Sequence, residues 1–159
     1  MRAWFDVRWG DLEGRSKEPD ESGVRVSQTA IGAIIEREVS RGVQAEKIVL
    51  AGFSQGGAIA LQAGLRYPQK LGGVMALSTY LPLAESFTKE ASAQNRATPI
   101  FMAHGVDDAV IQHSIGVRSR DVLVEAGYDV EWHEYPMAHS VCLPEMADIA
   151  AWLKRVLTR

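Results

Sequence analysis

The pentapeptide Gly52-Phe53-Ser54-Gln55-Gly56 places a serine between two glycines at the spacing G-x-S-x-G. A serine hydroxyl attacks a carbonyl carbon only when a base removes its proton and hydrogen-bond donors stabilise the oxyanion that forms. A sharp strand-to-helix turn meets the second need, because the next backbone N–H and the positive end of the helix face the developing charge. The pattern therefore predicts Ser54 as a nucleophile and the backbone N–H of Gln55 as an oxyanion donor.

The residues on either side of Ser54 have the composition that such a turn requires. The short apolar run 48–51 precedes it without alternation, as in a strand buried on both faces of a parallel sheet. Gly57 and Ala58 follow, and small residues are needed where a turn brings backbone groups close together. An apolar helical pattern then continues until shortly before Pro68. A glycine-rich turn that merely tolerates a serine would not need all three features.

The base that activates the serine should be a histidine in a loop after a later strand, behind the acid in sequence order. His139 directly follows a predicted strand and meets this requirement. His104 ends a strand ahead of the acids, and we expect it to fix the turn there. His113 begins a polar helix and should be solvated, while His133 lies within a strand. His139 is therefore the predicted base.

Two adjacent carboxylates, Asp107 and Asp108, follow the strand predicted at 99–103. Only one of them can accept the imidazole N–H that fixes the tautomer of the base and stabilises the imidazolium. The other is expected to cap the loop or to face solvent. Residue type and spacing alone leave both assignments open.

The elements that must position these groups alternate between strand and helix from residue 48 onward. This alternation indicates an α/β fold, a mostly parallel sheet with helices on both faces, in one domain over residues 1–159. Turn-rich segments indicate loops at 11–23 and at 80–98, the second with at most short helices. The predicted strands are 48–51, 73–78, 99–103 and 130–135, and the predicted helices are 24–41, the segment after Ser54, 115–126 and 144–157.

Composition excludes several other classes of protein. The 17 Lys and Arg against 20 Asp and Glu form no basic stripe, so no nucleic-acid partner is expected. No apolar run approaches the roughly 20 residues of a membrane span, and charges interrupt the N-terminal residues as they would not in a signal peptide. A cytoplasmic location is expected. The single cysteine, Cys142, excludes an internal disulfide and is read as a small buried thiol where the last helix begins.

The sequence resembles the phospholipase/carboxylesterase family of α/β-hydrolases, which includes acyl-protein thioesterases. The resemblance rests on five stretches in family order, and it implies that Asp108, four residues after His104, is the catalytic acid, with Asp107 at a variable position. These stretches are residues 3–6 (Ala-Trp-Phe-Asp), 52–57 (Gly-Phe-Ser-Gln-Gly-Gly), 76–82 (Ala-Leu-Ser-Thr-Tyr-Leu-Pro), 104–108 (His-Gly-Val-Asp-Asp) and 135–139 (Tyr-Pro-Met-Ala-His).

The resemblance also implies a difference from the family. Members usually carry further strands before the segment that matches residues 3–6, together with a His-Gly loop that supplies a second oxyanion N–H. The expectation is a domain that is incomplete at its N-terminus and lacks half of its oxyanion hole. Loss of one such donor typically lowers the rate by about 10²–10³-fold.

The activity implied is hydrolysis of a carboxylic ester or an acyl thioester through an acyl-enzyme at Ser54, with no metal or organic cofactor. Tyr80, Leu81 and Leu83 would line the acyl pocket by the same resemblance, against ordinary loop packing as the alternative. Two other hypotheses remain open: a catalytically impaired remnant of a hydrolase, and an α/β-hydrolase that acts on a lactone or a peptide. The small-molecule substrate is the expected partner, and a homodimer is left open.

Overall fold

The computed structural model describes residues 3–6 and 20–158 of the chain. Two single 3₁₀ turns, at 45–47 and 93–95, connect the longer elements. In chain order these are α2 (Glu21–Ser40), β1 (Val49–Phe53), α3 (Gln55–Gly64), β2 (Gly73–Leu77), α4 (Ala84–Glu90), β3 (Ile100–Gly105), α5 (His113–Glu125), β4 (Val130–Tyr135) and α6 (Leu143–Leu157).

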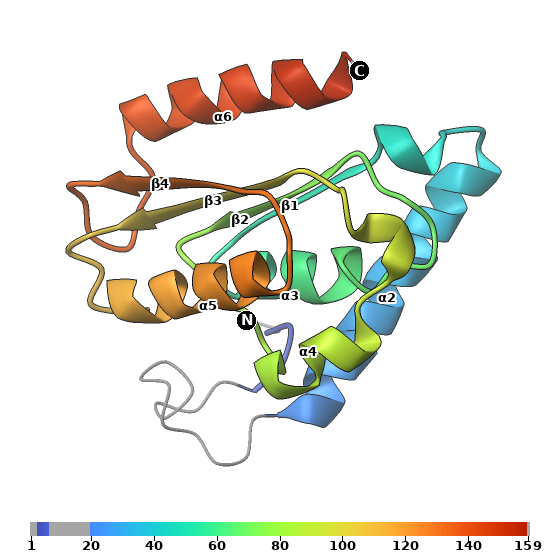
Figure 1. The fold of residues 1–159 in the computed structure, drawn as a ribbon, viewed down its shortest axis with the longest axis horizontal. Helices are drawn as coiled ribbons and strands as arrows, with labels where there is room; N and C mark the ends of the chain where they lie inside the picture. Colours follow the sequence, from blue (N-terminus) through green and yellow to red (C-terminus); the bar gives the residue numbers. More distant parts are fainter. Residues whose placement is uncertain (1–2, 7–19, 159) are drawn as a thin grey trace.

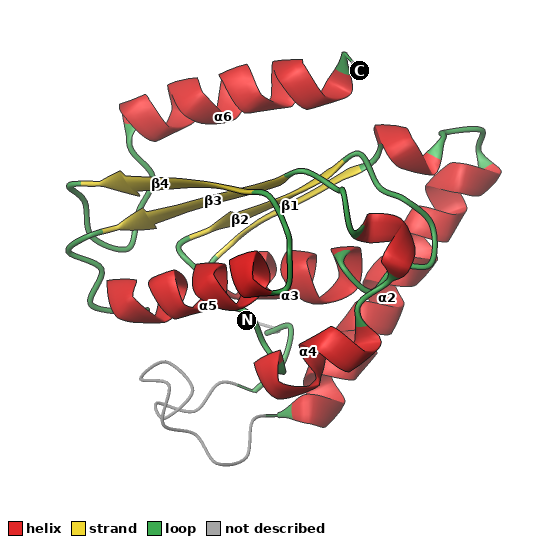
Figure 2. Ribbon diagram, viewed as in Figure 1, coloured by secondary structure: helices red, strands yellow, loops and turns green. Residues whose placement is uncertain are grey.

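The four described strands form one parallel sheet in the order β1-β2-β3-β4. Figure 1 shows α6 on one face of this sheet and α2, α3 and α5 on the other, and Figure 2 separates the same layers by element type. This arrangement confirms the predicted α/β class with helices on both faces. Because all strands run the same way, the loops that follow them gather at one edge of the sheet.

Each face of the sheet has its own hydrophobic core, because strand side chains alternate between the two faces. Toward α3 and α5, Leu61, Val74 and Met102 are buried together with Leu123. Toward α6, the buried cluster instead contains Phe101, Trp152 and other apolar residues. α3 lies deepest of the helices, with every residue from Gly57 to Gly64 buried, so the helix after Ser54 is fixed firmly against the sheet.

The strand before Ser54 differs from its prediction. β1 was expected to be buried on both faces, but in the described part of the chain it pairs only with β2, and Phe53 is 37% exposed. Alternate residues of β1 face the α6 side, where Val49 packs on the core while Ala51 and Phe53 are exposed. An unbroken apolar run predicts a strand, but it does not reveal how many neighbours that strand has.

The first helix begins earlier than predicted. The loop was expected to extend to Gly23, whereas α2 already starts at Glu21, and residues 11–19 of that loop lie outside the described part of the chain. Asp20 caps the helix, since its side chain accepts a hydrogen bond from the Gly23 N–H at 2.9 Å. Glu21 also suits the positive end of the helix. Gly42 follows the helix in the left-handed region that glycine adopts readily, with φ of +95°.

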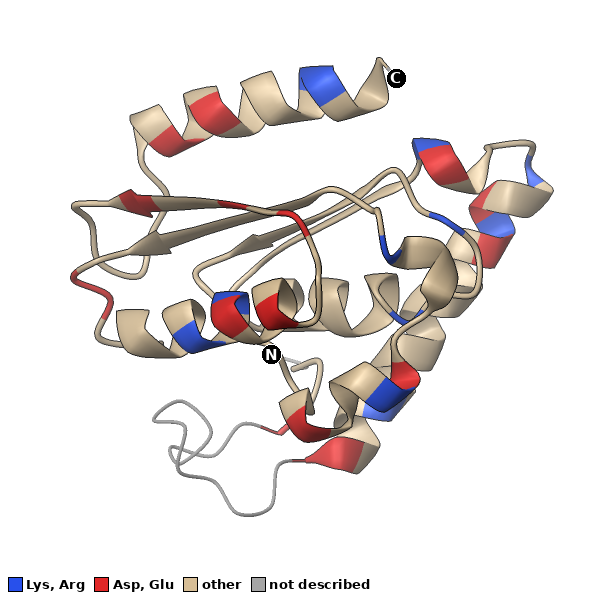
Figure 3. Cartoon of the chain, viewed as in Figure 1, with Lys and Arg blue, Asp and Glu red and all other residues tan. Residues whose placement is uncertain are grey.

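Charged residues of both signs occur along several of the described helices. Figure 3 shows acidic and basic residues interspersed along α2 and α5 of the described chain. None of the described helices is both long enough and apolar enough to cross a membrane.

One ion-pair network ties the loop after β2 to the helices beside it. The Arg66 side chain, 3% exposed, pairs with Glu90 of α4 at 2.7 Å and also donates to the Leu83 carbonyl at 3.4 Å. Arg25 of α2 pairs with the other Glu90 oxygen at 2.7 Å. The two guanidinium groups lower the pKa of Glu90 to about 2, Arg25 having the larger effect.

We expect Glu90→Gln to lower the free energy of unfolding at pH 7 by roughly 2–3 kcal/mol, because it leaves the buried Arg66 without a counter-charge. A carboxylate with a lowered pKa stabilises the fold fully above its unfolded value of 4.5, and this contribution is lost as the pH falls toward 2. Urea unfolding at several pH values measures both effects. Glu85→Gln, an exposed carboxylate of the same helix, is the control, and an equal loss in the two variants would contradict the network's role.

Candidate active site

Ser54 lies at the sharp turn between β1 and α3, as the sequence predicts. Its backbone has φ of +55° and ψ of −125°, a conformation that residues other than glycine rarely adopt. The Ser54 N–H donates to the Leu77 carbonyl of β2 at 2.8 Å, and the Ser54 carbonyl accepts the Thr79 hydroxyl at 2.6 Å. These bonds from the neighbouring strand hold the turn in place.

A glycine is required at position 52 by the close approach of two backbone segments. A Cβ atom there would lie 2.2 Å from the carbonyl group of Gly56, which is too short for any real contact. A Cβ at Gly57 would lie 2.8 Å from the Gly52 carbonyl oxygen. The small residues around Ser54 therefore let α3 start directly against the end of β1.

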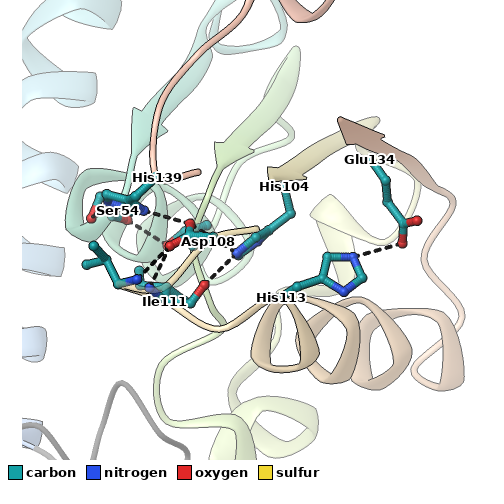
Figure 4. Close-up of polar contacts among 9 residues, drawn as sticks. Ser54, His104, Asp108, Ile111, His113, Glu134 and His139 are labelled. Carbon is teal, nitrogen blue, oxygen red and sulfur yellow. Dashed lines mark hydrogen bonds and ion pairs between the residues drawn. The ribbon is translucent and has the colours of Figure 1, made fainter. Parts of the chain in front are cut away.

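His139 comes from the loop after β4 and reaches the serine. Its Nε2 lies 2.9 Å from the Ser54 Oγ, and its side chain is 16% exposed (Figure 4). The Phe53 ring packs against the imidazole, with the ring centroids 4.7 Å apart. The imidazole and the Ser54 hydroxyl thus meet within hydrogen-bond distance, which is the geometry needed for proton transfer.

Of the two adjacent acids, the structure brings Asp108 to the histidine. Asp108 Oδ2 lies 2.7 Å from His139 Nδ1, while Oδ1 accepts the N–H groups of Val110 and Ile111 at 2.8 and 2.9 Å. The Asp108 side chain is fully buried. Asp107 is exposed, and its backbone N–H donates to the Met137 carbonyl at 3.1 Å. A carboxylate at the Asp108 position can orient the imidazole and stabilise its protonated form.

The loops that carry Asp108 and His139 touch each other at Gly105. A Cβ atom at Gly105 would lie 2.2 Å from the Met137 carbonyl oxygen, so only glycine lets the two loops approach this closely. The Val106 N–H also donates to the Tyr135 carbonyl at 2.9 Å. Residue type and spacing alone predict no role for Gly105. The position of Gly105 between His104 and the two adjacent acids was the signal in the sequence that could have indicated this close approach.

Gln55 follows Ser54 at the turn, and its side chain makes contacts that residue type alone does not predict. As the first residue of α3 its backbone N–H has no acceptor within the helix, and it follows Ser54 directly. Its side-chain amide accepts the Trp4 N–H at 3.0 Å and donates to the Phe5 carbonyl at 2.6 Å. The Gln55 side chain therefore anchors the segment 3–6 beside Ser54.

A cavity of about 380 Å³ lies between that segment, the loop after β2 and α5. Its walls are mostly apolar, and Asp20, Glu85 and Arg118 add charge to them. All three side chains predicted to form an acyl pocket line this cavity, as do two buried side chains from other elements. These five residues are Tyr80, Leu81, Leu83, Phe5 and Ile115.

The other histidines and the cysteine lie away from the serine hydroxyl. His104, at the end of β3, is buried and binds the Ile111 carbonyl at 2.9 Å, and burial lowers its pKa. His113 was expected to be solvated, but it is largely covered and pairs with Glu134 at 3.0 Å. His133 stacks on a buried ring. Cys142 directly precedes α6, but it is half-buried rather than buried as expected. The described residues contain no cluster of ligands able to hold a metal ion.

The known proteins that this chain is similar to include an acyl-protein thioesterase and a carboxylesterase. A model of the phospholipase/carboxylesterase family matches residues 1–157. An acyl-protein thioesterase 1 from Neurospora crassa is 40% identical over 164 residues, which cover all of this chain and 67% of that protein. The carboxylesterase SOBER1 of Arabidopsis thaliana is 36% identical over 99% of this chain and 69% of its own length. The crystal structure of SOBER1 superposes with a TM-score of 0.88, covering 99% of this chain and 75% of that one.

Proposed function

This chain belongs to the phospholipase/carboxylesterase family, and we propose that it is a serine hydrolase that cleaves carboxylic esters through an acyl-enzyme at Ser54. The observation that carries the proposal is the continuous contact from Ser54 Oγ through the His139 imidazole to the buried Asp108 carboxylate, at 2.9 and 2.7 Å. These residues come from three separate loops, so chain connectivity alone does not account for their meeting.

In the proposed reaction the Ser54 oxygen attacks the ester carbonyl while His139 Nε2 takes the hydroxyl proton. Asp108 holds the Nδ1–H, which leaves Nε2 free to act as the base. The tetrahedral oxyanion lies near the Gln55 N–H and the positive end of α3. His139 then gives its proton to the departing alkoxide, and an alcohol leaves. Water then gives a proton to the same imidazole and attacks the acyl carbon. The bond from that carbon to Ser54 Oγ breaks, His139 returns the proton to Ser54 Oγ, and the carboxylic acid leaves.

Two measurements on the purified chain test this proposal directly. The first is turnover of short-chain nitrophenyl esters. The second is reaction with a fluorophosphonate, followed by mass spectrometry of the peptide that contains Ser54. Ester turnover with modification confined to Ser54 supports the proposal. A folded chain that neither turns over these esters nor reacts with the fluorophosphonate would favour an impaired hydrolase remnant instead.

Thioester hydrolysis is the second candidate, and it is favoured by relatives that are named acyl-protein thioesterases. The same serine, histidine and acid would serve, since a thiolate is a better leaving group than an alkoxide and needs less help from the imidazolium. Matched oxygen and sulfur esters of one acyl chain compare the two activities. A higher kcat/KM for the sulfur ester would assign the chain to the thioesterase group.

The acyl group would enter the cavity lined by Tyr80, Leu81 and Leu83, and this predicts a chain-length effect. We expect Leu83→Trp to fill part of the cavity and to lower kcat/KM for octanoyl esters by roughly 10-fold or more, while acetyl esters react as before. The measurement is kcat/KM for a series of nitrophenyl esters from two to ten carbons.

Leu143→Trp supplies the matched control, because Leu143 is 86% exposed on α6 and does not line the cavity. This variant should keep the chain-length profile of the wild type. If Leu83→Trp lowers the rate equally for all chain lengths, or changes none of them, the cavity does not hold the acyl group.

A further inference from the structure

We propose that His104 is a positioning residue for Asp108, which holds the acid loop closed so that the carboxylate meets His139. The inference rests on the proposed function of Ser54, His139 and Asp108. It assigns to a buried histidine a part in the reaction that does not involve contact with substrate.

The contact that carries this inference joins the two ends of the loop that bears the acid. His104 is the penultimate residue of β3, and its side chain is 1% exposed. Its Nε2 lies 2.9 Å from the carbonyl oxygen of Ile111, seven residues later. The imidazole therefore bridges the base of the loop 105–112.

Ile111, the residue that His104 binds, also binds the Asp108 carboxylate. The Ile111 N–H donates to Asp108 Oδ1 at 2.9 Å, beside the Val110 N–H at 2.8 Å. Asp108 Oδ2 is then directed at His139 Nδ1. Figure 4 shows this row of polar contacts from His104 through Ile111 and Asp108 to His139 and Ser54. Movement of Ile111 would shift both donors that fix the carboxylate.

The protonation state of His104 fits this role. Burial lowers the pKa of His104, which favours the neutral ring, and because the Ile111 carbonyl oxygen can only accept, a hydrogen bond between them places the ring proton on Nε2. Nδ1 is buried without a partner among the described residues, which costs less for a bare lone pair than for an N–H. Nε2 also lies 3.4 Å from Asp108 Oδ2. The other titratable groups that act on His104 are His113 and His139.

A purely structural role is the alternative, because His104 also packs well. Its ring stacks on Trp132 with centroids 6.2 Å apart, and the His113 ring meets it edge-on at 5.9 Å. Gly116 leaves room for it, since a Cβ there would lie 2.4 Å from Nδ1. Packing requires the shape of the ring, whereas positioning requires the N–H at Nε2. Variants that separate shape from hydrogen bonding therefore distinguish the two roles.

The test compares His104→Leu, which fills the site without a donor, with His104→Gln, whose amide nitrogen can occupy the place of Nε2. We expect His104→Leu to lower kcat by about 10–100-fold with little change in KM, since a small displacement of a catalytic group has an effect of this order. His104→Gln should recover most of this loss. If His104→Leu does not fold, His104→Asn replaces it, because its shorter side chain cannot reach Ile111.

A second readout does not depend on turnover. The proton of the His139 Nδ1–Asp108 hydrogen bond should give a far-downfield NMR signal in the wild type and in His104→Gln. We expect this signal to weaken or disappear in His104→Leu. If the wild-type chain hydrolyses no ester, the proposed function fails, and the NMR signal alone then decides the positioning role.

His133→Gln is the matched control, because His133 lies on the neighbouring strand β4 and contacts Phe101 rather than the acid loop. It should leave kcat and the downfield proton unchanged. The inference is overturned if the Leu and Gln variants of His104 lose kcat equally, or if the downfield proton persists in the Leu variant.

Discussion

Replacing Ser54 with alanine should reduce ester turnover by about 10⁴-fold or more, to the level left by binding and the oxyanion donor alone. The variant loses the hydroxyl oxygen that lies 2.9 Å from His139 Nε2 and could attack a carbonyl, while the backbone bonds of the turn remain. Covalent labelling by a fluorophosphonate should disappear at the same time. Initial rates with a nitrophenyl acetate and gel-based labelling measure the two effects.

Ser140→Ala is the control for this prediction. Ser140 is exposed and follows His139 directly in the sequence. It is therefore a second serine close to the proposed base. The control should keep both turnover and labelling, and circular dichroism should show all the variants folded. Labelling that persists in Ser54→Ala would remove Ser54 from its proposed role.

Asp108→Asn should lower kcat by about 10⁴-fold, the effect known for loss of the acid of a catalytic triad. The amide can present an N–H to His139 Nδ1, which favours the wrong tautomer and leaves the protonated imidazole without its counter-charge. The substitution is nearly the same size, so the bonds from Val110 and Ile111 to the side-chain oxygen can remain. Steady-state kinetics at several pH values measure the loss.

The neighbouring Asp107 offers a matched control of the same chemistry. Asp107→Asn changes an exposed side chain that makes no contact with His139, and we expect activity within about twofold of the wild type. A large loss in Asp107→Asn together with an active Asp108→Asn would move the role of the acid to Asp107.

Much of the fold was predictable because β1, β2 and β3 are apolar runs and the helices show apolar stripes of the right period. The confirmed parallel sheet follows from their alternation. The position of β1 within the sheet was not predictable, because the apolar run at 48–51 carries no information on its neighbours. The first turn of α2 was missed for a different reason: the polar stretch around Asp20 is typical both of a loop and of a helix N-terminus.

For the candidate site, sequence order predicted Ser54 and His139 as partners, and their side chains lie 2.9 Å apart because loops after parallel strands share one edge of the sheet. The choice between Asp107 and Asp108 came from the family resemblance. Residue type could not supply it, since successive side chains point in different directions and only the path of the loop decides which one reaches His139. Contacts made through the backbone, such as that between His104 and Ile111, leave no pattern in residue types. They become visible only in three dimensions.

The backbone of Ser54 has φ of +55° and ψ of −125°. This conformation lowers the stability of the fold when the residue is a serine, whereas the proposed chemistry requires a serine there. Glycine adopts this conformation without steric cost, whereas a serine there raises the energy of the native state by about 1–3 kcal/mol. Under selection for folding alone, position 54 would drift toward glycine and the protein would become more stable. Persistence of serine at this turn among relatives of this chain would therefore be a signature of selection for catalysis, and a relative with glycine there would have exchanged activity for stability.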